Sequence, residues 1–176
     1  MKRQNPEKLG KMISGFSCSK DSAVEKFLKT NALYFEQEGF SRTYLYITDE
    51  TTPRIAAFFT VAITATNLEG IRTSRRKKIL GGKPGRDAKD HFGGLLIAQI
   101  GRSDGFSTTD INGAEMIEAA EEIIEKGRYY LGGKVIYLDC ESALIGLYKS
   151  NGYELVSEEP FYKAYYKMFK PLTRLM

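Results

Sequence analysis

The stretch 94–153 constrains the fold more than any other part of the chain, because strand and helix patterns alternate along it. An apolar run at 95–100 is followed by a polar loop at 101–110, and helical periodicity begins near Asn112. A second apolar run, at 135–138, precedes a short helical segment. Two such strands joined by a helix are expected to be buried and parallel, with a right-handed crossover.

The helix after the polar loop has start and stop signals. Asn112, with Glu115 three residues later, forms a capping pair for free backbone amides. Gly132 and Gly133 provide a stop, because glycine adopts the left-handed conformation that ends helices. The N-terminus of this helix is expected beyond the carboxyl end of the first strand, where its amides and dipole favour a phosphate group. Apolar residues at helical spacing are Met116, Ile117, Ala120, Ile123 and Ile124.

The flanking segments predict further helices and strands. The expected elements are a short edge strand around Met12–Ile13, a helix at 21–38, strands at 44–47 and 54–64, and strands at 153–156 and 162–169. A turn at 49–53 makes the first two long strands an antiparallel hairpin.

Composition excludes several classes of protein. The chain of 176 residues is long enough for one domain with a substantial core, and its longest nearly apolar run, Ile55–Ile63, is too short to cross a bilayer. No apolar segment follows the charged N-terminus, so we expect no signal peptide and a cytoplasmic protein. Cys18 and Cys140 make no disulfide framework, and together with the lone His91 they make no zinc cluster of recognised spacing. We therefore expect a cytoplasmic protein without a bound metal.

One window, at about 70–91, differs sharply in charge from the rest of the chain. Its eight basic residues stand against only Asp87 and Asp90, in a protein whose net charge is +4. Its glycines and Pro84 predict a loop. Two interpretations stay open: a solvated insertion, or a phosphate-binding patch for a nucleic acid that acts through counterion release. The basic residues are Arg72, Arg75, Arg76, Lys77, Lys78, Lys83, Arg86 and Lys89.

The segment Leu147-Tyr148-Lys149-Ser150-Asn151-Gly152-Tyr153 resembles the (Phe/Leu)-Tyr-x-x-x-Gly-(Phe/Tyr) signature of the GNAT superfamily of acyl-CoA-dependent N-acetyltransferases. The order of elements agrees with that superfamily. Gly15-Phe16-Ser17-Cys18 and Ser41-Arg42-Thr43-Tyr44 resemble toxin-type GNAT proteins of bacterial toxin–antitoxin pairs. The resemblance covers nearly the whole chain. It implies an α/β (α+β) GNAT fold in one domain, 1–176: a mixed central sheet splayed between two parallel strands and flanked by helices, with the basic window as a loop insertion.

The resemblance also implies acetyl-CoA as co-substrate, bound between strands at 96–102 and 135–139. Its pantetheine is expected along the backbone of 100–102 and its pyrophosphate on the amides of 108–114. The family's phosphate loop reads Gln/Arg-x-x-Gly-x-Gly/Ala, and only the final glycine is kept here. Asp110 would repel an anion unless it acts as a local cap and points away. The implied cofactor-binding residues are Ile100, Gly101, Arg102, Thr108, Thr109, Asn112, Gly113 and Ala114.

The mechanism implied by the resemblance is direct attack of an amine on the thioester. A backbone N–H near Ile100 would stabilise the oxyanion, and Tyr148 would protonate the departing thiolate. A phenol with a pKa of about 10 keeps its proton at neutral pH. From spacing alone, however, Tyr148 fits a core position better than a catalytic one, because aromatic side chains mostly pack. The general base stays open between His91, Glu141 and an ordered water, and Cys140 is not expected to form a covalent intermediate.

Two functions follow from these observations. The first is an N-acetyltransferase for a primary amine; the toxin-like half and the basic window favour an aminoacyl-tRNA acceptor, contacted through Arg75, Arg76, Lys77 and Lys78, while a small molecule or a protein lysine stays open. The alternative is a catalytically degenerate GNAT-fold protein that binds acyl-CoA or a partner without turnover, because the glycine loop is eroded. A flavodoxin-like nucleotide binder fits the central pattern less well, since an antiparallel hairpin precedes it. The resemblance also suggests a homodimer and binding to an antitoxin, but no residue of the sequence specifies either.

Overall fold

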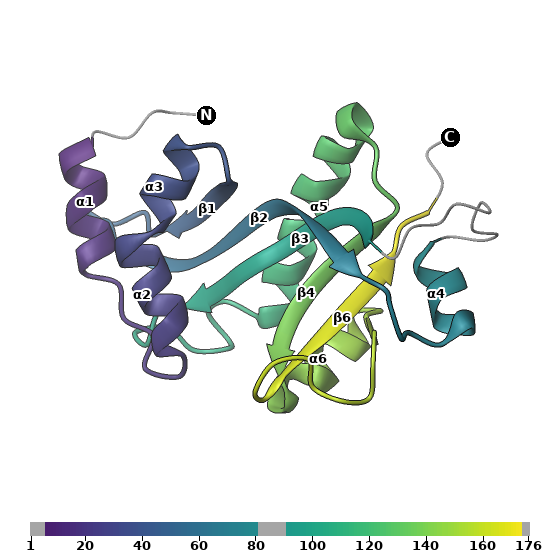
Figure 1. Ribbon diagram of the computed structural model, residues 1–176. Coiled ribbons are helices and arrows are strands. Elements are labelled where there is room, and N and C mark those ends of the chain that lie inside the picture. The colour runs from purple at the N-terminus through teal and green to yellow at the C-terminus, as the bar shows by residue number, and fades with distance from the viewer. Residues whose placement is uncertain (1–5, 81–90, 174–176) are drawn as a thin grey trace. The chain divides into compact units, whose positions relative to one another are not determined.

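The computed structural model describes residues 6–80 and 91–173. Its chain falls into two compact units: unit 1 is Met1–Val61 with Gln99–Ile117, and unit 2 is Ala62–Ala98 with Glu118–Met176 (Figure 1). The strands form a mixed six-stranded sheet in the order β1-β2-β3-β4-β6-β5, and β2 and β3 supply residues to both units. None of the described helices is long and apolar enough to cross a membrane.

The helices and strands have the following bounds. In chain order they are α1 (Pro6–Ser14), α2 (Ser22–Thr30), α3 (Ala32–Gln37), β1 (Ser41–Ile47), β2 (Ile55–Asn67), α4 (Thr73–Ile79), β3 (His91–Arg102), α5 (Gly113–Leu131), β4 (Val135–Glu141), the 3₁₀ helix η1 (Ser142–Leu144), α6 (Ile145–Ser150), β5 (Glu154–Leu155) and β6 (Tyr165–Pro171).

The N-terminal segment of unit 1 is a helix, so the prediction of an edge strand at Met12–Ile13 was wrong. Both residues are buried on α1, in a cluster that also contains Leu9 and Phe16. Leu9, Met12, Ile13 and Phe16 recur at helical spacing, which is the signal that the strand interpretation missed. Burial of this stripe against neighbouring apolar side chains stabilises the helix more than local propensity does.

The helix predicted at 21–38 is divided into α2 and α3 at Asn31. Its start was predicted correctly, because the Asp21 carboxylate accepts hydrogen bonds from the Ala23 and Val24 amides at 2.9 and 3.2 Å. Near the break, the Thr30 hydroxyl donates to the Lys26 carbonyl at 2.8 Å, a bond back along the helix that destabilises regular geometry. Asn31 therefore ends one helix and begins the next.

The hairpin predicted in unit 1 is present as β1 and the first part of β2. The Thr48 amide donates to the Arg54 carbonyl at 3.0 Å and closes the turn. Phe58 on β2 packs edge-to-face against Phe16, with ring centroids 5.4 Å apart. The hairpin thus gives the helices of unit 1 an apolar surface to bury.

β4 of unit 2 is paired very differently on its two sides. Towards β6 the antiparallel register runs through all seven residues, from Val135 opposite Pro171 to Glu141 opposite Tyr165. Towards β3 the parallel register joins only Leu95 with Ile136 and Leu96 with Tyr137. The parallel pair was predicted. Within the described chain, one edge of β4 therefore lacks a β3 partner beyond Tyr137.

The two faces of β4 are covered by different helices. Val135 and Tyr137 pack with Ile79 and Leu80 at the end of α4. Successive side chains alternate between faces, so Ile136 and its register partner Lys170 share the opposite face. Lys170 bonds to Glu121 there, which places α5 on that face (Figure 1).

The basic window begins with a helix, where a loop was predicted. Residues 73–79 form α4, and Ile79 and Leu80 are buried in the core of unit 2. This first part is consequently anchored in the core, contrary to the picture of a solvated insertion. Gly81–Asp90, including Lys83, Arg86 and Lys89, lie outside the described residues.

Candidate active site

The end of β3 carries three residues predicted to bind the cofactor, and the sequence there is fixed by packing. A Cβ at Gly101 would lie 2.5 Å from the Val24 Cγ1 and 2.8 Å from the Phe58 ring, so no larger residue fits. Ile100 is half-buried, and the Arg102 guanidinium donates to the Ile111 carbonyl at 2.7 Å. Arg102 therefore ties the strand to the loop that follows.

That loop, 107–112, is held by its own polar groups. The Asp110 carboxylate accepts from both the amide and the hydroxyl of Ser107, each at 2.7 Å. The Ser107 hydroxyl lies 2.7 Å from that of Thr109. The hydrogen bonds from the Ser107 amide and hydroxyl, followed by the nearby Arg102 charge, lower the pKa of Asp110. Asp110 is thus a local cap, as one of the two readings of this residue predicted, and it stays ionised.

The loop's internal hydrogen bonds leave some amides unused. The amides of Thr109, Asp110 and Ile111 donate to oxygen atoms of Ser107. At the start of α5, the Ala114 amide donates to the Asn112 side chain at 2.9 Å. Within the described residues, the amides of Thr108, Asn112 and Gly113 have no such acceptor. These three amides, at the N-terminus of a 19-residue helix, fit an anionic group.

Arg54 lies beside this loop and was missed by sequence reasoning. Its guanidinium carbon is 5.3 Å from the centroid of the Phe106 ring, and its side chain is paired with Glu50 at 3.1 Å. It precedes β2, far from the loop in sequence. The neighbouring strands β2 and β3, joined here by the Ser103 amide donating to the Ala56 carbonyl at 2.9 Å, bring the two together.

Tyr148 is a buried residue of α6 in unit 2. Gly152 takes a φ of +85°, a conformation that favours glycine, and the Tyr153 amide then returns to the Tyr148 carbonyl at 3.0 Å. The Tyr153 ring packs edge-to-face on that of Tyr148, with centroids 5.8 Å apart. The glycine and final tyrosine of the predicted signature thus fix the turn that holds Tyr148.

The surroundings of Tyr148 keep its hydroxyl neutral. Burial, and secondarily the neighbouring Cys140, raise the pKa of Tyr148 to about 12. Burial likewise raises the pKa of the Cys140 thiol to about 11, and that thiol donates to the Met168 sulfur at 3.5 Å. A protonated thiol is a poor nucleophile, in keeping with the prediction that Cys140 forms no covalent intermediate.

Tyr153 is itself braced by an ion pair that the sequence did not reveal. The Lys170 ammonium lies 5.5 Å from the Tyr153 ring centroid and bonds to both oxygens of Glu121, at 2.7 and 2.9 Å. Burial and the Glu121 charge raise the pKa of Tyr153 as well. The spacing of Glu121 and Lys170 in the sequence gives no sign of this contact.

The candidates for a general base are exposed. His91 begins β3, and Glu141 ends β4 opposite Tyr165, immediately before the η1–α6 segment that carries Tyr148. Nothing in unit 2 singles out either of them as the base. The described residues contain no group of three or more His, Cys, Asp or Glu side chains able to hold a metal ion.

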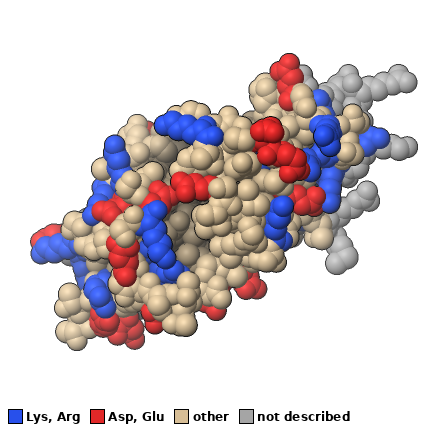
Figure 2. Space-filling model, turned by 90° about the horizontal axis from the view of Figure 1, so that it is seen from below, with Lys and Arg blue, Asp and Glu red and all other residues tan. Residues whose placement is uncertain are grey.

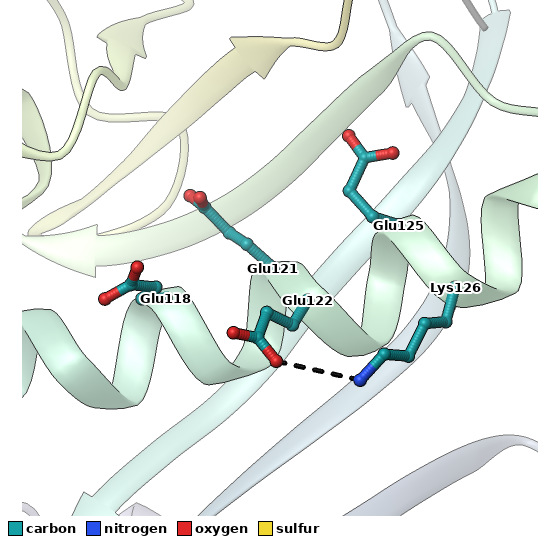
Figure 3. Close-up of a pocket in the computed structure, with 5 residues that line it drawn as sticks. All are labelled: Glu118, Glu121, Glu122, Glu125 and Lys126. Atoms are coloured by element: carbon teal, nitrogen blue, oxygen red, sulfur yellow. Dashed lines mark ion pairs between the residues drawn. The ribbon is translucent and has the colours of Figure 1, made fainter.

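An open hollow of about 520 Å³ lies along α5 and is lined by acidic residues (Figure 3). Glu118, Glu121, Glu122 and Glu125 project from the helix, and Lys126 is paired with Glu122 at 3.6 Å. Such a surface repels phosphates and includes none of the residues predicted to bind acetyl-CoA. It is therefore a poor cofactor site.

At least two of the four predicted RNA-contacting residues already have acidic partners. Arg75 pairs with Glu158 at 3.1 Å and Lys78 with Glu154 at 2.6 Å, while Lys77 is exposed. In Figure 2, basic and acidic side chains are interspersed on the face shown. The charge that α4 offers to a polyanion is consequently smaller than its sequence suggests.

Comparisons with known proteins connect this geometry to a fold. No protein-family model matches the chain, and no curated protein matches it in sequence. Among solved structures, one described as a bacterial toxin has a TM-score of 0.73 at 16% identity, with 96% of this chain and 85% of that chain covered. A mutant of KacT has a TM-score of 0.68 at 16% identity, covering 90% and 86%.

A third solved structure is AtaT complexed with acetyl-methionyl-tRNAfMet, with a TM-score of 0.68 at 15% identity, covering 90% of this chain and 86% of that one. KacT and AtaT are GNAT-type toxins of toxin–antitoxin systems. The similarity extends over nearly the whole described chain, whereas the sequences have diverged widely. The protein therefore has the GNAT fold that the sequence predicted, and it shares this fold with bacterial toxins such as KacT and AtaT.

Proposed function

We propose that the protein is an acetyl-CoA-dependent N-acetyltransferase with Tyr148 as its general acid. The observation that carries the proposal is a buried, neutral Tyr148 just beyond β4, a strand whose β3-facing edge is paired only as far as Tyr137. A half-paired edge leaves backbone groups available to an extended ligand. The GNAT fold of the chain supports the same reading at the level of architecture.

Acetyl-CoA would be held by backbone groups more than by side chains. The backbone of Ile100–Arg102 fits an extended pantetheine chain, and the amides of Thr108, Asn112 and Gly113 fit a pyrophosphate. The hydroxyl of Thr109 adds a polar contact, whereas the Ala114 amide, also predicted to bind the cofactor, is already bonded to the Asn112 side chain. AtaT, in a structure with AtaR, is described as bound with acetyl-CoA.

Tyr148 holds its proton throughout the physiological pH range, because a phenol with a pKa of about 12 stays neutral there. Bound acetyl-CoA supplies the acetyl group and a thiolate leaving group. A thiolate in a poorly solvated site also has a raised proton affinity, so the Tyr148 hydroxyl is matched to it better than the two solution pKa values suggest. Mutants with a tyrosine replaced by phenylalanine have been solved for KacT and AtaT.

We further propose an aminoacyl-tRNA as acceptor. The basic window supports this, and so does a solved complex of AtaT with acetyl-methionyl-tRNAfMet. AtaT has also been solved with its antitoxin AtaR, which makes an antitoxin partner worth testing here. Of the four basic residues assigned to RNA, Lys77 is the strongest candidate, because Arg75 and Lys78 are ion-paired within unit 2.

The decisive experiment is a calorimetric titration of acetyl-CoA into the purified protein at low and moderate salt. We expect binding that weakens with salt, followed by transfer of acetyl to charged tRNA. Binding of acetyl-CoA without acetylation of any amine, in a panel of tRNAs, lysine peptides and polyamines, would contradict the proposed acetyltransferase activity.

A second candidate function is binding without turnover. It is favoured by the loop at 107–112, whose glycines are missing and whose polar groups satisfy one another around an ionised Asp110. In that case the protein binds acetyl-CoA but transfers no acetyl group, so Tyr148→Phe has no effect on acetyl transfer. Absence of acetyl-CoA binding would instead direct the search to a protein partner.

A further inference from the structure

The hairpin turn before β6 carries two exposed aromatic rings. Phe161 and Tyr162 are 52% and 57% exposed. The Tyr165 amide donates to the Tyr162 carbonyl at 2.8 Å, and the Phe161 amide donates to the Tyr165 carbonyl at 3.0 Å. These bonds fix the backbone, so the rings are presented on a rigid support.

Lysine side chains lie over both rings. The Lys163 ammonium is 5.2 Å from the Tyr162 ring centroid, and the Lys167 ammonium is 4.7 Å from that of Phe161. Lys167 is also paired with Asp139 at 2.9 Å, whereas Lys163 is exposed. The turn therefore combines flat aromatic surface with at least one accessible positive charge.

Lys163 has a φ of +49°, a left-handed conformation found at no other described non-glycine residue. A lysine there costs about 1 kcal/mol relative to a right-handed conformation. Asparagine or glycine would relieve the strain. Strain of this kind is concentrated at functional sites, which is a second and independent reason to examine the turn.

The register of the sheet places this turn at the same end of unit 2 as Tyr148. Tyr165, at the start of β6, is opposite Glu141, at the end of β4, and η1 and α6 follow Glu141 directly. Figure 1 shows α6 and the loop into β6 at this end of β4. An acceptor resting on the turn would be close to the helix that bears the general acid.

We propose that Phe161, Tyr162 and Lys163 form a stacking platform for the unpaired 3′ nucleotides of an RNA acceptor. Bases stack on exposed aromatic rings, and a lysine beside them meets the adjacent phosphate. A purely apolar partner would bury the Lys163 charge at a cost, while a nucleotide satisfies ring and charge together. Glu159 is exposed two residues before the rings, so few phosphates are contacted and stacking carries most of the affinity. The inference rests on the proposed function, because it names the surface that receives its acceptor.

The test measures binding of a short single-stranded RNA ending in CCA by fluorescence anisotropy at two salt concentrations. The double variant Phe161→Ala/Tyr162→Ala should bind about 10-fold to 100-fold more weakly, while its acetyl-CoA affinity is unchanged. The matched control is Tyr129→Ala/Tyr130→Ala at the end of α5, where the rings are 74% and 84% exposed and no described cation lies over them. This control should bind RNA like the unaltered protein.

Two further variants keep the test decisive if the alanine variant folds poorly. Phe161→Tyr/Tyr162→Phe should retain RNA binding, because both rings remain. Lys163→Gln should lower the salt slope of RNA binding by about 0.7, the value for one phosphate contact on a single strand. Equal RNA affinity of the platform variant and the control would overturn the inference, as would preference for duplex over single-stranded RNA.

The same measurements separate the two proposals. RNA binding that depends on Phe161 and Tyr162, without any binding of acetyl-CoA, would support the platform and contradict the proposed acetyltransferase function. Acetyl transfer to amines without measurable RNA affinity would contradict the platform and support the proposed acetyltransferase function. Loss of both RNA and acetyl-CoA binding in a folded platform variant would also contradict the platform, because it assigns these residues to RNA alone.

Discussion

In unit 2 the segment 148–153 is held by packing, whereas in unit 1 the loop 107–112 is held by hydrogen bonds among its own polar groups. Tyr148 and Tyr153 are buried, and their rings pack edge-to-face on each other. Ser107 and Asp110 are exposed and bonded to each other. Packing involves many neighbours and constrains each residue type strongly, while a local polar network admits many solutions. The segment 148–153 therefore tolerates fewer residue types than the loop 107–112 does.

The largest expected effect is on the proposed catalytic role of the packed segment. Tyr148→Phe keeps the ring and its contact with Tyr153 but removes the transferable proton, so acetyl transfer should slow by about 10² to 10⁴-fold. Acetyl-CoA affinity and the melting temperature should stay within error, as calorimetry and thermal unfolding would report. An equal fall in affinity would mean that Tyr148 acts in binding. An unchanged rate would exclude it as the acid.

The packed segment should also be sensitive to alkali. The folded state holds the pKa of Tyr148 at about 12, above the ordinary value of about 10, so the protonated form is favoured on folding. The associated stability is fully present below about pH 10 and is lost as the pH rises towards 12. By linkage, the raised pKa of Tyr148 contributes roughly 3 kcal/mol at most to the free energy of unfolding. Tyr148→Phe should lessen the fall in the free energy of unfolding between pH 10 and 12, measured in urea. Part of the fall remains, because burial also raises the pKa values of Tyr137 and Tyr153. Tyr129→Phe, at an exposed position, should leave the fall as it is.

A third test concerns the strand that leads into the polar loop. In Gly101→Ala the new Cβ meets Val24 and Phe58 at 2.5 and 2.8 Å, and overpacking of this kind costs about 1–3 kcal/mol. Urea unfolding should show the loss, and Gly105→Ala serves as control because a Cβ there would come no nearer than 3.9 Å to Arg54. Equal stability of the two variants would mean that the end of β3 adapts more easily than its packing indicates.

The smallest expected effect is a gain of function in the polar loop. Asp110→Asn retains an acceptor for Ser107 and removes the negative charge, so acetyl-CoA should bind several-fold more tightly at low salt and less so at high salt. Asp104→Asn is the matched control, since that carboxylate bonds to Ser19 instead of to the loop. Tightening by both variants alike would show a general charge effect. No tightening by Asp110→Asn would show that its carboxylate points away from the ligand.

The same aspartate gives the loop an opposite pH dependence. The pKa of Asp110 is lowered by its bonds to Ser107, so the stabilisation from these bonds is present above the ordinary pKa of about 4 and is lost as the pH falls below it. The polar loop therefore weakens in acid and the tyrosine segment in alkali. Amide hydrogen exchange at 107–112 across acidic pH would measure the first half of this contrast.

Elements with a long-range hydrophobic pattern were predicted well. The parallel pair β3–β4 and the start of α5 at Asn112 follow from runs of apolar residues and their end signals. The tyrosine segment was identified from its resemblance to a family signature. Prediction was wrong where a pattern was short. Met12–Ile13 is too brief to distinguish strand from helix without the flanking Leu9 and Phe16.

The site residues stay a prediction, and the contacts that several of them make across the fold were not predicted. Charge counting treated Arg75 and Lys78 as available, because their acidic partners Glu158 and Glu154 lie on a different part of the chain. Arg54 beside Phe106, and Lys170 beneath Tyr153, are likewise tertiary contacts with no local signal. Such pairs depend on strand order and register, which spacing within one segment does not specify.

The uneven pairing of β4 has a consequence for the order of folding. β4 and β6 are joined by a shorter stretch of chain than β3 and β4 are, and the β4–β6 ladder is much longer than the β3–β4 ladder. The entropic cost of loop closure per contact is therefore lower for β4–β6. The antiparallel ladder is then the natural nucleus of unit 2, to which β3 adds later. On this view a cavity-creating substitution of Met168 should slow folding, whereas one of Leu96 should mainly speed unfolding.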